Sequence, residues 1–239
     1  MTPTQTYYND LLFLAGKINL YILLIPIVVG VYHWKNLNVS LKIFLYFKLA
    51  DLVYNFSEII FIYTVKSFAS FKKIIFSLDI HDTSFLGIFG LFITYYFIGR
   101  FYSKLLEKPT SFWIRWSSWF LLLLSIIIYF FIDGYNKQGS VNQTVYRFYI
   151  GIVPILYVGQ IFQSKVSFNL WKNSYFLISL GLLIPNLLSV IMSIVSDNIH
   201  ENNFPLFVKL SLIRNGFGFF SEIIFAYAFF NARYVNRLK

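Results

Sequence analysis

Residues 112–131 read FWIRWSSWFLLLLSIIIYFF, a run of 20 residues with a single charged side chain, Arg115. An α-helix rises about 1.5 Å per residue, so a helix of this length would extend about 30 Å, which matches the hydrocarbon thickness of a bilayer. Charged residues flank the run, with Lys108 before it and Asp133 after it. The run therefore predicts a helix that crosses a membrane.

Apolar runs of similar length recur along the whole chain. They cover residues 11–33, 40–64, 83–105, 112–131, 146–162, 174–196 and 206–230. Residues 68–78, between the second and third runs, have apolar side chains on one helical face, which predicts a short helix at the membrane surface. Seven spans joined by short loops leave no room for a soluble domain. The sequence thus predicts an all-α integral membrane protein, a seven-transmembrane-helix bundle that forms a single domain over residues 1–239.

The composition points the same way. Hydrophobic residues make up 58% of the chain and charged residues only 13%, which is far from the balance of a soluble domain. The net charge of +10 comes from Lys and Arg residues that are spread singly, without the basic stripe of a nucleic-acid-binding protein, so we expect no nucleic acid partner. The chain has no cysteine, and its three histidines lack the spacing of metal ligands, so we expect no metal and no cofactor.

The distribution of basic residues predicts the orientation. One side of the predicted membrane holds eleven: Lys35, Lys42, Arg100, Lys104, Lys108, Arg115, Lys165, Lys172, Arg233, Arg237 and Lys239. The other side holds six: Lys66, Lys72, Lys73, Lys137, Arg147 and Lys209. All five tryptophans lie toward the richer side, which should be cytoplasmic. The N-terminus is then outside and the C-terminus inside.

Two of the predicted spans carry ionisable residues within the membrane. Lys48, Asp51, Asn55 and Glu58 are spaced three, four and three residues apart, which places them on one face of the second span. The seventh span contributes Arg214, Asn215 and Glu222, with Gly216 and Gly218 expected to allow close approach of another helix. Because charges are costly in lipid, we expect these residues to face the interior and to form a polar pathway or pocket.

The second and seventh spans would run in opposite directions, so their charges become complementary in depth. We predict two ion pairs, Lys48 with Glu222 and Glu58 with Arg214. These pairs either fix helix register only or line a functional pathway. Asp51 then has no cation of its own unless it shares Lys48.

The role of Asp51 has two alternatives. It could carry a proton, or it could stay neutral as a structural acid that hydrogen bonds to an amide side chain. The candidate amides are Asn186, Asn215 and Gln160.

A short motif occurs in both polar spans. Residues 56–61 and residues 220–225 both read FSEIIF, and a tyrosine follows two positions later in each. In antiparallel spans this match could reflect an inverted repeat of the kind found in transporters. It could also be coincidence, because phenylalanine and isoleucine are abundant and the match is not sustained.

Three functions are compatible with these features. The favoured one is a small transporter or channel-like protein of the plasma (inner) membrane, with its pathway between the second and seventh spans. The alternative is a receptor or sensor that signals through a membrane or cytoplasmic partner protein, with a homo-oligomer as a further form. The third is a membrane-embedded lipid enzyme, for which Asp79, His81 and Asp82 are the only local cluster near one interface. We assign no catalytic residue and favour a non-enzymatic function.

Overall fold

The computed structural model describes residues 3–78, 80, 83–133, 140–163 and 169–235. Over these ranges the chain is helical and contains no β-strand. The all-helical fold class predicted from the sequence is therefore confirmed for the described part.

The long helices are α1 (Pro3–Tyr32), α2 (Val39–Ser67), α4 (Gly87–Ser103), α5 (Thr110–Ile128), α6 (Ser140–Gln163), α7 (Ser174–Asn202) and α8 (Phe204–Phe230). The short helices are α3 (Ala69–Ser77) and α9 (Ala232–Val235). A π-helical turn, η3 (Tyr129–Asp133), continues α5. Single 3₁₀ turns are η1 (Trp34–Asn36), η2 (Ser84–Leu86) and η4 (Leu170–Lys172).

Asparagine side chains cap the starts of three long helices. Asn38 accepts a hydrogen bond from the Leu41 amide at the start of α2 (3.1 Å). Asn173 accepts hydrogen bonds from two backbone amides at the start of α7. Asn203 accepts one from the Leu206 amide at the start of α8 (3.1 Å). The first amides of a helix have no partner within the helix, so these asparagines determine where each helix begins.

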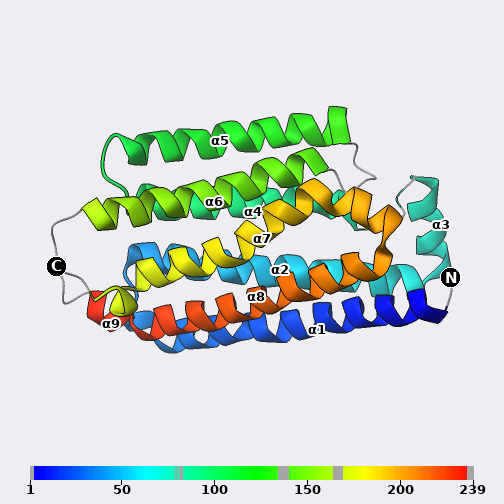
Figure 1. Cartoon of the computed structure of the whole chain (residues 1–239), viewed down its shortest axis with the longest axis horizontal. Coiled ribbons are helices and arrows are strands. Elements are labelled where there is room, and N and C mark those ends of the chain that lie inside the picture. Colours follow the sequence, from blue (N-terminus) through cyan, green and yellow to red (C-terminus); the bar gives the residue numbers. More distant parts are fainter. Residues whose placement is uncertain (1–2, 79, 81–82, 134–139, 164–168, 236–239) are drawn as a thin grey trace.

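The long helices lie side by side along one axis, and consecutive ones run in opposite directions (Figure 1). Helix α8 packs against α7 and α1, α4 packs against α2 and α5, and α6 packs against α7. We call the end of the bundle that contains α9 the α9 end, and the opposite end, which contains α3, the α3 end (Figure 1). At the α9 end, α1, α4, α6 and α8 finish and α2, α5 and α7 begin.

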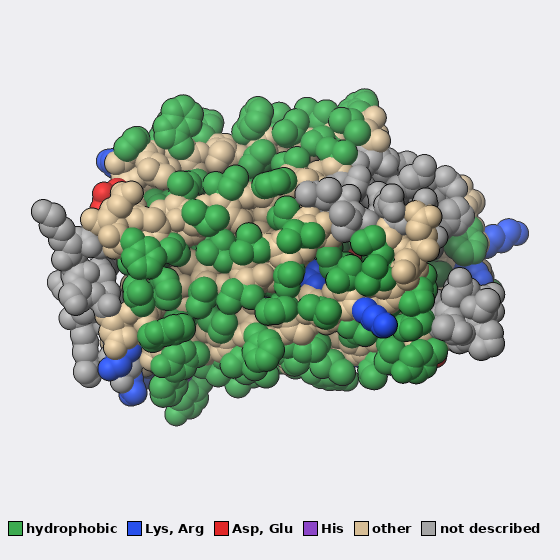
Figure 2. Space-filling model, in the orientation of Figure 1, with side chains coloured by type: hydrophobic (Ala, Val, Ile, Leu, Met, Phe, Trp, Pro, Cys, Tyr) green, Lys and Arg blue, Asp and Glu red, His purple; other side chains and the backbone are tan. Residues whose placement is uncertain are grey.

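Among the described residues, four helical segments are long and apolar enough to cross a membrane: Asp10–Tyr32, Thr110–Ile132, Val141–Gln163 and Ser174–Met192. Helices α2 and α8 have the length but are interrupted by ionic residues, and α4 has only 17 residues. Apolar side chains cover much of the visible surface along the bundle (Figure 2). These features indicate a membrane-embedded protein.

The apolar core is concentrated toward the α9 end. Its most buried large side chains include Phe44, Tyr102, Ile178 and Phe229. On α2, the buried residues begin at Ser40 and stop at Lys48, so the remaining five turns are half-buried or exposed. On α8, none of residues 212–220 is buried. Packing is therefore tight at the α9 end and looser toward the α3 end.

Glycines on different helices differ in how closely a neighbouring helix approaches them. A Cβ added to Gly99 or Gly181 would overlap side chains of a neighbouring helix, at 2.0 Å from Ser118 Oγ and 2.5 Å from the Phe225 ring. A Cβ on Gly216 or Gly218 would meet nothing within 4 Å. We expected a neighbouring helix to lie close to these two glycines, and this prediction is wrong. The small size of glycine permits such an approach but does not cause one.

Some predicted boundaries shift. Helix α6 starts at Ser140, six residues before the predicted start of that span, and α1 starts at Pro3 rather than at residue 11. The helix predicted over residues 68–78 is found as α3. Pro154 and Pro185 lie inside α6 and α7, and α7 changes direction along its length (Figure 1).

Candidate functional site

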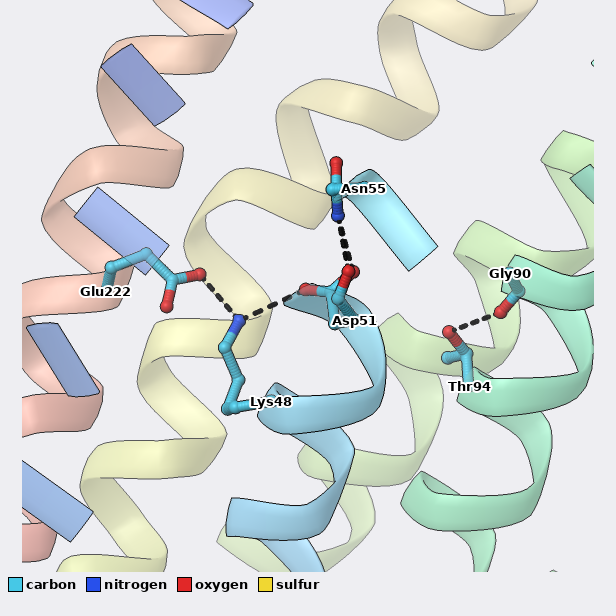
Figure 3. Close-up of polar contacts among 6 residues, drawn as sticks. All are labelled: Lys48, Asp51, Asn55, Gly90, Thr94 and Glu222. Carbon is cyan, nitrogen blue, oxygen red and sulfur yellow. Dashed lines mark hydrogen bonds and ion pairs between the residues drawn. The ribbon is translucent and has the colours of Figure 1, made fainter. Parts of the chain in front are cut away.

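Lys48 lies at the centre of an ionic cluster inside the bundle (Figure 3). Its Nζ is 2.7 Å from Glu222 Oε1 on α8 and 3.4 Å from Asp51 Oδ2, one turn further along α2. The Lys48 side chain is only 3% exposed, whereas that of Asp51 is 30% exposed. The predicted pairing of Lys48 with Glu222 is confirmed, and it joins two helices that are distant in the sequence.

Aromatic rings complete the surroundings of Lys48. The ring centroids of Phe225 and Phe47 lie 5.2 Å and 5.6 Å from Nζ. Such contacts attract a desolvated cation and also keep water away from it. Glu222 Oε2 is buried and has no hydrogen-bond partner in the described part of the chain. The pair is therefore held in an apolar setting with one acceptor position left open.

Asp51 shares Lys48 and also interacts with Asn55. The Asn55 amide donates to Asp51 Oδ1 (3.1 Å) and to the Asp51 carbonyl oxygen (2.7 Å), as Figure 3 shows. The expectation that Asn186, Asn215 or Gln160 would satisfy Asp51 is wrong, because Asn55 is one helical turn away on the same face. Gln160 instead accepts from the Glu107 amide (3.1 Å).

Glu58 does not pair with Arg214. Its Oε1 accepts a hydrogen bond from the Tyr54 hydroxyl (2.7 Å), and no carboxylate of the described residues lies within ion-pair distance of Arg214. The predicted Glu58–Arg214 pair is therefore wrong. A donor at position i−4 reaches Glu58 without crossing the bundle, so the local partner prevails over the distant one.

The sequence predicts that Arg147 lies in an outer connection, but in the structure it lies within helix α6. Its Nε is buried without a hydrogen-bond partner in the described structure. The Asn186 amide of α7 donates to the Arg147 carbonyl oxygen (2.6 Å), which joins α6 to α7 at this level. Arg214 on α8 is half-buried, as Arg147 is.

Asn215 is half-buried beside Arg214, and its side chain makes no hydrogen bond within the described ranges. Tyr146, which precedes Arg147 on α6, contacts the Tyr95 ring of α4 edge to face, with the ring centroids 6.3 Å apart. On α4, the Thr94 hydroxyl donates to the Gly90 carbonyl oxygen (3.0 Å). The Lys48–Glu222 pair joins α2 to α8, and the Asn186–Arg147 hydrogen bond joins α7 to α6. We call the polar residues that α2, α6 and α8 contribute the polar region.

The charges of this region are unevenly distributed. Lys48 is shared by two carboxylates, and Glu58 is neutralised by no cation of the described chain. Arg147 and Arg214, in contrast, form no ion pair with a carboxylate of the described residues. An anion could therefore be accommodated at the arginines, and a cation or proton at Asp51 and Glu58.

Within the described residues, no group of three acidic or histidine side chains is arranged to hold a metal ion. Asp79, His81 and Asp82, the cluster considered for a lipid enzyme, lie outside the described residues.

Comparisons with protein-family models, with curated proteins and with solved structures found no match.

Proposed function

We propose that this chain is a multi-pass membrane protein that transports a small polar or charged solute through the polar region between α2, α6 and α8. The seven long helices would each cross the membrane, with the N-terminus outside and the C-terminus in the cytoplasm. The plasma (inner) membrane is the proposed location.

The proposed orientation rests on the α9 end. This end carries the basic residues of the loops after α1 and α4, and all five tryptophans lie in its turns and in the first half of α5. Basic loops favour the cytoplasmic side, and indole rings favour the headgroup boundary. The tightly packed α9 end would then face the cytoplasm, and the looser α3 end would face outward.

The observation that carries the proposal is the change in packing at Lys48. Below it, toward the α9 end, Phe44, Leu41 and their neighbours are fully buried. Beyond it, Asp51, Asn55 and Glu58 are half-buried on a stretch of α2 that has no buried residue. A purely structural ion pair would be enclosed on both sides, whereas this one lies where a dense core meets a more accessible polar face. Such a boundary is expected of a solute path that is closed at one end.

The arginines support a solute with negative charge. Arg147 Nε is buried without a described partner, and Arg214 forms no ion pair within the described residues, so both guanidinium groups favour an anion as counter-charge. Helix α7, which contacts Arg147 through Asn186, also contains Pro185, so a change in its bend would reach this site directly.

A flux assay tests the proposal. The purified chain is inserted into liposomes, and stopped-flow light scattering follows the response to gradients of glycerol, sodium chloride and sodium formate. We expect faster equilibration than in empty liposomes for at least one of these solutes. Asp51→Asn should alter the flux, and Arg147→Gln should abolish anion flux selectively, because it removes a buried cation that has no described counter-charge.

The matched control is Ser57→Ala, which lies on the exposed side of α2 and whose hydroxyl donates only to the Tyr54 carbonyl oxygen (2.7 Å). It should transport as the unmodified chain does. Identical flux in Asp51→Asn and in the unmodified chain would remove Asp51 from the pathway. Well-folded protein with no flux of any solute would overturn the transport proposal in favour of a receptor that acts through a second copy or a membrane partner.

A further inference from the structure

A second polar site lies outside the ionic cluster, between α4 and α5 at the α9 end. It is a pocket of about 760 Å³. Its lining comprises Tyr95, Tyr96, Gly99, Arg100, Ser103, Lys104, Lys108, Pro109, Ser111, Phe112, Arg115, Ser118, Trp119 and Leu122. Binding pockets for small molecules have volumes in the range of about 300–1,000 Å³, so this one is large enough for a lipid headgroup.

The mouth of the pocket is strongly basic. Arg100, Lys104, Lys108 and Arg115 line it, and no acidic residue does. All four side chains are exposed, and none is in an ion pair within the described chain. Glu107, which precedes Lys108 in the sequence, is not part of the lining. Four positive charges around one cavity favour a ligand with at least one negative charge.

One of these charges is held in place. Arg100 Nη1 donates to the Tyr96 hydroxyl (3.0 Å), and the Arg100 guanidinium lies 5.9 Å from the centre of the Tyr96 ring. The Tyr96 ring in turn contacts Trp119 of α5 edge to face at 6.0 Å. The aromatic pair thus orients a guanidinium at the wall of the pocket, as phosphate recognition requires.

Beyond its basic residues, the lining of the pocket continues along the helices. Leu122 and Tyr95 lie there, where α4 and α5 approach closely because Gly99 has no side chain next to Ser118. On the outer surface of α5, Trp116, Trp119, Phe120 and Leu123 are exposed. The site is therefore charged at the end of the bundle and apolar along its side, which is the polarity of an amphiphile that lies parallel to the helices.

We propose that this pocket binds the phosphate headgroup of an anionic phospholipid, with the acyl chains along α5. A soluble phosphate would match the four charges equally well. The continuous exposed aromatic surface of α5, however, favours a ligand with an apolar tail. In the proposed orientation the pocket lies in the cytoplasmic leaflet, but the binding does not depend on the transport function.

Native mass spectrometry of the chain purified in a neutral detergent tests this site. The protein is titrated with dioleoylphosphatidylglycerol, with dioleoylphosphatidylcholine and with glycerol 1-phosphate, which is the headgroup without its tails. We expect preferential binding of the anionic lipid. Lys104→Gln with Arg115→Gln should weaken that binding roughly 10- to 30-fold, because each basic residue near an anionic headgroup contributes about fivefold in affinity.

The control is Lys35→Gln with Lys42→Gln, which removes the same charge from the same end of the bundle but away from the pocket. It should bind the anionic lipid as the unmodified chain does. If the double variant of the pocket does not fold, Lys104→Gln alone, at an exposed position, should still weaken binding several-fold. Equal binding of the two lipids, or an equal loss in the control, would overturn the proposal. Glycerol 1-phosphate that competes as strongly as the lipid would overturn the lipid assignment in favour of a soluble phosphate ligand.

Discussion

Glu222→Gln removes the negative charge that lies 2.7 Å from Lys48 Nζ and keeps the size of the side chain. Lys48 is 3% exposed and cannot turn toward solvent without disturbing the core around Phe47 and Phe225. After the substitution, Asp51, at 3.4 Å, is the one carboxylate of the described residues that still pairs with the ammonium. The variant therefore tests how much stability depends on the link between α2 and α8.

The magnitude follows from the two distances. With an effective dielectric constant of about 20, Coulomb's law gives about 6 kcal/mol for the attraction to Glu222 and about 5 kcal/mol for that to Asp51. Asp51 thus still supplies nearly half of the electrostatic attraction that stabilises the charge on Lys48. Removal of one partner from a buried pair costs roughly 3–5 kcal/mol, and the remaining Asp51 places the expected loss near the lower limit, about 3 kcal/mol.

Reversible unfolding in mixed micelles, followed by far-ultraviolet circular dichroism, measures this loss. The matched variant carries Lys48→Met together with Glu222→Met and should recover to within about 1 kcal/mol of the unmodified chain, because apolar residues can replace a buried pair. A loss below about 1 kcal/mol for Glu222→Gln would show that the pair is hydrated. A double variant that is as unstable as the single one would refute the coupling between the two residues.

Glu58→Gln should cost less than about 1 kcal/mol in the same assay, because the Tyr54 hydroxyl can still donate to the amide oxygen and the site is half-buried. A loss as large as that of Glu222→Gln would mean that Glu58 has an ionic partner after all. Gly99→Ala should lower the free energy of unfolding by about 1–3 kcal/mol, because the new Cβ would lie 2.0 Å from Ser118 Oγ. Gly159→Ala is its control: a Cβ there meets nothing within 4 Å, so the helix should be unchanged or stabilised by up to about 1 kcal/mol. Equal losses in the two glycine variants would contradict the close packing of α4 on α5.

The helices could be predicted because the signal for each is local. The run over residues 112–131 corresponds to α5 and its π-helical extension, and the amphipathic segment after α2 corresponds to α3. The Lys48–Glu222 pair was also predictable, since antiparallel helices of known length set the relative depth of their charges. The sequence therefore predicts which charges lie at the same depth, once the order of the helices is assumed.

The errors arose where local and distant partners compete. Glu58 has a tyrosine donor one turn earlier on its own helix, and spacing alone gives no reason to prefer it over Arg214. Arg147 follows the polar residues 142–144, which are typical of a loop, yet the helix includes them because Asn142 donates to the Ser125 carbonyl oxygen (2.8 Å). That bond depends on how α6 packs against α5, which no pattern within either segment indicates. The basic pocket was missed for the same reason, because it requires two helices to be placed side by side.

The position of all five tryptophans at the α9 end gives the chain an optical property. Selective excitation of indole reports on one end of the bundle only, because the described α3 end contains none. In sealed liposomes, iodide added outside would quench the emission of those chains whose α9 end faces outward and leave the others unaffected. The quenched fraction therefore counts the two insertion directions in a reconstituted sample without any label, and it allows the measured flux to be expressed per correctly inserted molecule.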